Sequence, residues 1–157
     1  MRAPSGRALA LAALLGAAAL AAAPALAAGA EPIGQIKTAT GSVTVEHGSS
    51  SKAAAPGDRV FVTDVVRTGA DGSVGITFRD NSLVSIGPDS VLAIDRFVFD
   101  STTHQGNFDA SLKQGTLAVV SGKLAKQSPD AMKVKTPAAI LGVRGTEFLV
   151  RTGPAKD

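Results

Sequence analysis

The sequence predicts an all-β protein: a single-domain β-solenoid or β-helix-like stack of short strands, preceded by a signal peptide. Three observations carry this prediction. Apolar residues alternate with polar ones in short runs, turn-forming residues separate the runs, and equivalent apolar positions return at a constant step of eight residues. Beyond residue 30, no segment keeps the 3.6-residue periodicity of an amphipathic helix.

The stretch from Val66 to Ile94 shows the pattern most clearly. Ile76, Val84 and Leu92 follow one another at steps of eight residues, and each sits in an alternating run. A fixed step with one inward face predicts short strands laid side by side, either as a meander or as coils of a solenoid. We therefore expect Val84 and Ile86 to point into the core.

The N-terminal segment has the three parts of a secretory signal peptide. Arg2 and Arg7 precede an Ala/Leu run over residues 8–20, and small residues mark a cleavage site at Ala27, with Ala30 as a second candidate. We predict that residues 1–27 are the signal peptide, with cleavage after Ala27 or Ala30. A retained anchor is the alternative, but the run is short of the roughly 18–20 residues that a spanning helix needs. The expected location is periplasmic or secreted, with no stable membrane span after cleavage.

The charge of the chain gives no support for a nucleic-acid partner. The full chain carries 16 basic and 13 acidic residues, and loss of Arg2 and Arg7 would leave it nearly neutral. Four lysines form a mild basic cluster, for which a solvated face is the default and contact with an anionic envelope polymer the alternative. They are Lys123, Lys126, Lys133 and Lys135. Without cysteine, the chain can form no disulfide.

The other predicted strands, taken in order, repeat the same alternation within a domain spanning residues 31–152, and 153–157 form a tail. The expected inward sets are Val43 and Val45; Val60 and Val62; Phe97 and Phe99; Phe108, Ala110 and Leu112; Leu117 and Val119; and Met132 and Val134. We interpret residues 47–55, 100–107 and 121–131 as loops, the last with room for a helical turn.

The ionisable residues show no arrangement typical of an enzyme. His47 and His104 are the only histidines; both stand in polar stretches with no acidic or hydroxyl partner at triad-like spacing, so we expect surface positions. Asp71, Asp80 and Asp89 recur every nine residues, as in calcium-binding β-rolls. Because the GGxGxD context is missing, turn capping is the preferred interpretation. The sequence predicts no catalytic, cofactor or metal site.

Arg144 and Glu147 flank a Gly-Thr pair near the C-terminus. They could pair across a turn, or the arginine could reach a row of buried carbonyls, since a buried charge needs a partner. We expect Gly145 to permit a bulge or a positive-φ turn. The functional alternative is a recognition patch.

Four motifs together resemble the FecR-type periplasmic domain family. They are GSVTV at 41–45, GDRV at 57–60, the strand-rich run at 67–94, and TPAAILGVRGTEFLV at 136–150. The last is the most specific, and its residues are the candidate interaction residues: Thr136, Pro137, Arg144, Gly145, Thr146 and Glu147. The resemblance covers roughly Ile36 to Val150 and implies a β-rich, solenoid-like module.

The resemblance also implies a setting in the cell envelope. In the family's best-known regulators this domain follows a cytoplasmic anti-sigma segment and a spanning helix, and precedes a small domain that meets an outer-membrane siderophore transporter. With a signal peptide at residue 1, the chain is expected to be a stand-alone secreted member. We predict a non-catalytic module that binds another envelope protein or envelope component. The alternative is a component of a cell-surface signalling or sigma-regulator system with a separately encoded partner.

Overall fold

The computed structural model describes residues 29–145 and 147–153 and confirms the all-β class. The predicted signal peptide lies outside these residues, as does Thr146. The described elements are β1 (Gly34–Thr40), β2 (Val43–His47), β3 (Ser50–Ala53), β4 (Arg59–Val60), β5 (Val65–Thr68), β6 (Ser73–Phe78), β7 (Leu83–Ile86), β8 (Val91–Phe99), β9 (Gly106–Val120), α1 (Lys123–Gln127), β10 (Met132–Lys135), β11 (Ile140–Gly142) and β12 (Glu147–Thr152).

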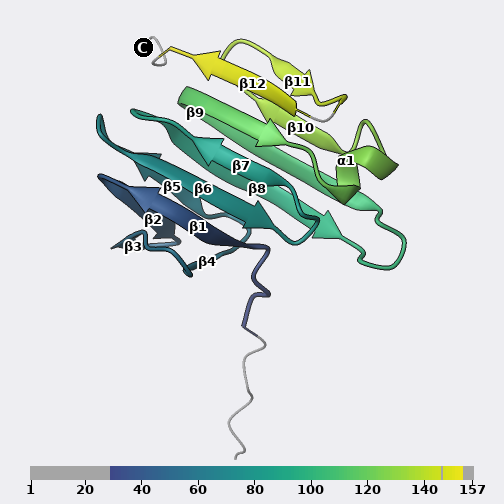
Figure 1. Cartoon of the computed structure of the whole chain (residues 1–157), viewed down its shortest axis with the longest axis horizontal. Coiled ribbons are helices and arrows are strands. Elements are labelled where there is room, and N and C mark those ends of the chain that lie inside the picture. The colour runs from purple at the N-terminus through teal and green to yellow at the C-terminus, as the bar shows by residue number, and fades with distance from the viewer. Residues whose placement is uncertain (1–28, 146, 154–157) are drawn as a thin grey trace, which may run out of the picture.

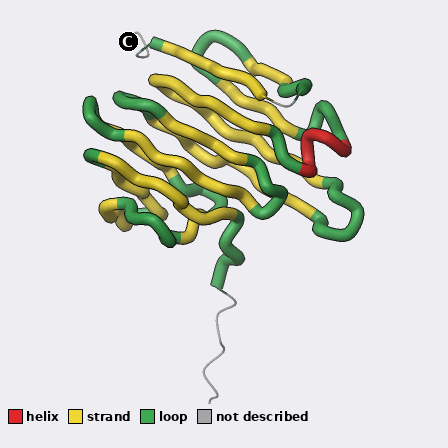
Figure 2. Tube along the Cα trace, in the orientation of Figure 1, coloured by secondary structure: helices red, strands yellow, loops and turns green. Residues whose placement is uncertain are grey.

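The strands form one sheet that curls into two layers, like half of a barrel (Figures 1 and 2). Layer A contains β4, β1, β6, β7, the second half of β9, and β12. Layer B contains β3, β2, β5, β8, the first half of β9, β10 and β11. The long strand β9 belongs to both layers and joins them.

At one end of the molecule the chain crosses between the layers at corners around residues 41–42, 69–72, 87–90 and 114–115. Hydrogen bonds link these corners in a row. Gly69 N–H donates to the Ser42 carbonyl oxygen over 2.8 Å, and Asp89 N–H donates to that of Gly69 over 3.0 Å. Ser90 Oγ then accepts from Thr116 N–H over 2.9 Å. The corners therefore form one bonded end of the molecule.

The structure does not show the predicted solenoid stack. The described strand pairs are antiparallel, apart from the parallel pair β9–β10. Ile76 and Val84 face each other in a hairpin, whereas Leu92 lies across a corner in the other layer. The eight-residue step therefore comes from a hairpin followed by a corner, two connections of equal length, and not from repeated coils.

The alternating residues fill the space between the two layers, as predicted. Val84 and Ile86 are each 1% exposed. Phe78 and Phe108 lie 4.7 Å apart between ring centroids, and Phe97 packs against both. Helix α1, the helical turn allowed for in residues 121–131, buries Leu124 at the end away from the corners (Figure 2). Residues 47–55, predicted as a loop, instead contain β3.

Candidate functional site

The curled sheet ends in two different edges, and these are the candidate contact surfaces. We call β3, β4 and the connection at 54–58 the N-terminal edge. We call β11 and β12 the C-terminal edge. A strand at a sheet edge has backbone N–H and C=O groups free to pair with another chain, unless something covers them.

The N-terminal edge is closed by its own connection. Ala54 N–H donates to the Val43 carbonyl oxygen in layer B over 2.9 Å, while Gly57 N–H donates to that of Ile36 in layer A over 2.8 Å. Asp58 ties the connection together, because its carboxylate accepts from Ala55 N–H and lies 3.0 Å from Lys52 Nζ. The connection therefore bridges the two layers here. Although β3 pairs with β2 alone and β4 with β1 alone, β3 is polar and carries Lys52, and a lysine on an edge strand opposes strand addition.

A buried carboxylate beside the N-terminal edge corrects one prediction. Asp64 is 1% exposed and accepts hydrogen bonds from Phe61 N–H at 2.9 Å and from His47 Nδ1 at 2.5 Å. His47 is thus not an isolated loop residue, although its side chain is 56% exposed. No pattern in the sequence predicts this pair, since the two residues meet only when β2 and the 61–64 turn come together. His104 does lie in a loop, stacked on Phe99.

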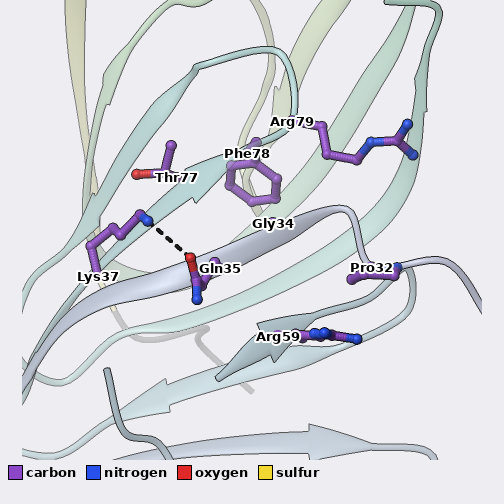
Figure 3. Close-up of a pocket in the computed structure, with 8 residues that line it drawn as sticks. All are labelled: Pro32, Gly34, Gln35, Lys37, Arg59, Thr77, Phe78 and Arg79. Carbon is purple, nitrogen blue, oxygen red and sulfur yellow. Dashed lines mark hydrogen bonds between the residues drawn. The ribbon is translucent and has the colours of Figure 1, made fainter. Parts of the chain in front are cut away.

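A cationic groove runs over the outer face of layer A (Figure 3). It encloses about 510 Å³, and Lys37, Arg59 and Arg79 contribute to its lining. Lys37 Nζ donates to Gln35 Oε1 over 2.9 Å, and Arg79 pairs with Glu31. The residues lining the groove include no carboxylate that could act as a general base.

The C-terminal edge is open among the described residues. There β12 pairs with β9 alone and β11 with β10 alone. Large apolar side chains stand exposed on both strands: Ile140 at 66% and Leu149 at 69%. Free backbone groups beside exposed apolar side chains are the features that strand-addition partners use.

The structure places the described motif residues, 136–145 and 147–150, along this open edge. Thr136 closes the β10–β11 turn by hydrogen bonds with Ala139, and the exposed Pro137 lies within that turn. Gly145 has φ of 117°, the positive-φ conformation predicted for it. Glu147 begins β12 and is exposed.

Arg144 pairs with neither of its predicted partners. Its Nη2 atom lies 3.2 Å from Asp130 Oδ1, and both side chains are exposed. The exposed guanidinium therefore needs no buried carbonyls, and the ion pair stays on the surface between α1 and β10.

The three regularly spaced aspartates are not brought together. Asp71 lies in the corner before β6, and Asp80 lies in the turn after it, at the other end of that strand. The pKa of Asp71 is below its usual value, because the carboxylate accepts from Ser42 N–H. Asp80 accepts from Ser82 N–H and from its hydroxyl group. Among the described residues, no group of three His, Cys, Asp or Glu side chains could hold a metal ion.

Comparison with known families shows which protein family the chain belongs to. The family model described as FecR protein matches residues 64–156, more than half of the chain. The chain belongs to the FecR family. No curated protein and no solved structure matches it. The matched FecR region runs from the start of β5 past β12, so it includes the whole C-terminal edge but not β1 to β4.

FecR domains are associated with regulators of cell-surface signalling, and are usually periplasmic. In the described part of the chain, no helix is long and apolar enough to cross a membrane.

Proposed function

We propose that this FecR-family chain is a non-catalytic, exported interaction module of the cell envelope that binds another envelope protein through its C-terminal edge. The observation that carries the proposal is the open strand β12, with Leu149 exposed at 69% beside free backbone groups. Apolar side chains next to an unpaired strand give a partner both backbone hydrogen bonds and a surface to bury.

A place in cell-surface signalling is the specific form of this proposal. Membership of the FecR family supports a partner encoded separately and belonging to a signalling or sigma-regulator system. A general scaffolding role uses the same edge, and the identity of the captured partner distinguishes the two. An envelope component other than protein is less favoured, because a free strand edge is complementary to another polypeptide backbone.

Site-specific photo-crosslinking in cells tests the contact surface. A photoreactive residue at Leu149 or at Ile140 is expected to give crosslinked products with an envelope protein. Ser51 is the matched control, because it is exposed on β3 at the closed edge. Equal crosslinking from Ser51 and Leu149, or none from either C-terminal position, contradicts the proposal.

Export itself has a separate test. N-terminal sequencing of the protein recovered from the envelope fraction is expected to begin at Ala28 or Glu31. A sequence beginning at Met1 overturns the proposed signal peptide.

A further inference from the structure

We infer that β12 pairs antiparallel with β12 of a second copy, so that two chains form a continuous layer A. This deepens the proposed function, on which it rests, by naming a second copy as one occupant of the C-terminal edge. The inference comes from the order of charged and apolar residues along β12.

Strand β12 carries a self-complementary row on its outer face. Glu147, Leu149 and Arg151 are exposed, while Val150 between them is 7% exposed and points inward. Among the described residues, neither Glu147 nor Arg151 has an ion-pair partner. The row therefore presents an acid and a base at equal distances on either side of an exposed leucine.

Antiparallel pairing of two such strands has one register that satisfies every outward residue. When Leu149 faces its own copy, Glu147 faces Arg151 of the second chain, and the same pair repeats on the other side of the two-fold axis. Facing side chains in an antiparallel pair are close enough to interact, and opposite charges there are favourable. Because the contact is isologous, each favourable pair occurs twice.

Other registers lose these contacts. A slip of one residue turns the outward row of one chain toward the inward row of the other, so that Arg151 falls on the side of Val150. A slip of two residues puts one charge of each pair opposite Leu149. The register centred on Leu149 is therefore specified by both charge and face.

The strand also lacks most of the devices that block edge pairing, and the two charges it does carry, Glu147 and Arg151, are the ones that this register pairs. Natural edges are protected by lysine, proline, bulges or inward charges. β12 contains no lysine, proline or glycine, and its six residues keep an unbroken register with β9. On the same outer face, Val120 of β9 lies opposite Glu147 and is 41% exposed, which extends the apolar surface inward from the edge.

Sedimentation of the purified protein tests the inference by charge reversal. Wild type is expected to show a concentration-dependent monomer–dimer equilibrium that weakens at high salt. R151E places like charges opposite each other twice, so its dimer dissociation constant is expected to rise about tenfold, as for E147R. The double variant E147R/R151E restores opposite charges and is expected to recover dimerisation.

The controls separate pairing from misfolding and from the proposed function. V98D changes an exposed residue of β8 in layer B and should leave the dissociation constant unchanged. A wild-type protein that stays monomeric on the order of 1 mM, or a double variant no better than R151E, overturns the inference. Photo-crosslinks from Leu149 to another protein would still uphold the proposed function after such a result. A dimer restored by the double variant upholds the inference. If Leu149 then gives no crosslink to another protein, that result counts against the proposed binding of a separate envelope protein and leaves the dimer standing.

Discussion

The two edges of the sheet both end in strands that have a partner on one side only, and they differ in what their side chains offer to another chain. At the N-terminal edge, β3 is exposed on both faces, and the connection at 54–58 bonds to β1 and β2. At the C-terminal edge, β11 and β12 keep unpaired backbone and expose Ile140 and Leu149. The strands at both edges have one partner each, but only the C-terminal edge combines this with large exposed apolar side chains and no lysine, so strand addition is favoured there.

Both edges are built on one common core, so the largest effect is expected from a substitution in that core, which disrupts both edges together. Val84→Asp places a carboxylate at a position 1% exposed between the layers, and we expect it to cost more than about 4 kcal/mol and unfold the domain. Thermal melting followed by circular dichroism measures this. The matched control is Leu83→Asp, at a neighbouring position 47% exposed, with an expected change within about 0.5 kcal/mol. A cooperative, unshifted transition for Val84→Asp would falsify the assignment of β7 as the centre of layer A.

A second change separates the closed edge from the open one. Asp64→Ala removes the buried acceptor of Phe61 N–H and of His47, and we expect it to destabilise the protein by about 2 kcal/mol. Thermal melting measures the loss, and His47→Ala is the control, with a smaller effect because the histidine is largely exposed. Hydrogen exchange should rise in β2 and β4 more than in β12. Equal loss of protection at both edges would show that the closed edge has no stability of its own.

Acid should open the same edge first. The pKa of Asp58 is lowered by its hydrogen bonds from the Lys52 side chain and Ala55 N–H. A carboxylate with a lowered folded pKa stabilises the protein fully above its usual value of 3.8, and this contribution is lost as the pH falls through the folded pKa. Hydrogen exchange near and below that usual value should therefore increase at 52–58 before it does in β12. Asp58→Asn, which cannot titrate, should remove this pH dependence; an unchanged acid profile in the variant would contradict the role of Asp58.

The smallest effect on stability is expected at the open edge. Leu149→Lys leaves an exposed position exposed, so the free energy of unfolding should change by no more than about 0.5 kcal/mol. Lysine at an edge opposes strand addition, so affinity purification from the envelope fraction should recover less partner protein. Lost stability with retained partner binding would reverse the comparison between the two edges.

The sequence predicts the faces of strands better than their partners. Alternation places Val84, Ile86, Met132 and Val134 in the core because a period of two reports which side of a sheet a residue faces, whatever lies beside it. It does not report which strand is next, so a hairpin followed by a corner is indistinguishable from two solenoid coils. Strand β3 was missed because all four of its residues are exposed, which leaves no apolar alternation to detect.

For the candidate site, too, local features could be predicted from the sequence, whereas features that depend on strand pairing could not. The closing motif at 136–150 indicates the right region, and the positive φ of Gly145 could be predicted from the residue type alone. That this region forms an open edge depends on β9 pairing with β12, across almost thirty residues of chain. The His47–Asp64 contact depends in the same way on a turn meeting a strand 17 positions away.

The row of corners restricts how the sequence can change over evolutionary time. A Cβ atom at Gly115, where φ is 98°, would lie 1.9 Å from Ser90 Oγ, and that hydroxyl group is what accepts from Thr116 N–H. Ser90 N–H in turn donates to Thr68 Oγ1. Replacement at any one of these positions removes or displaces a bond made by another, so relatives that keep this bend are expected to vary at residues 68, 90 and 115 jointly or not at all.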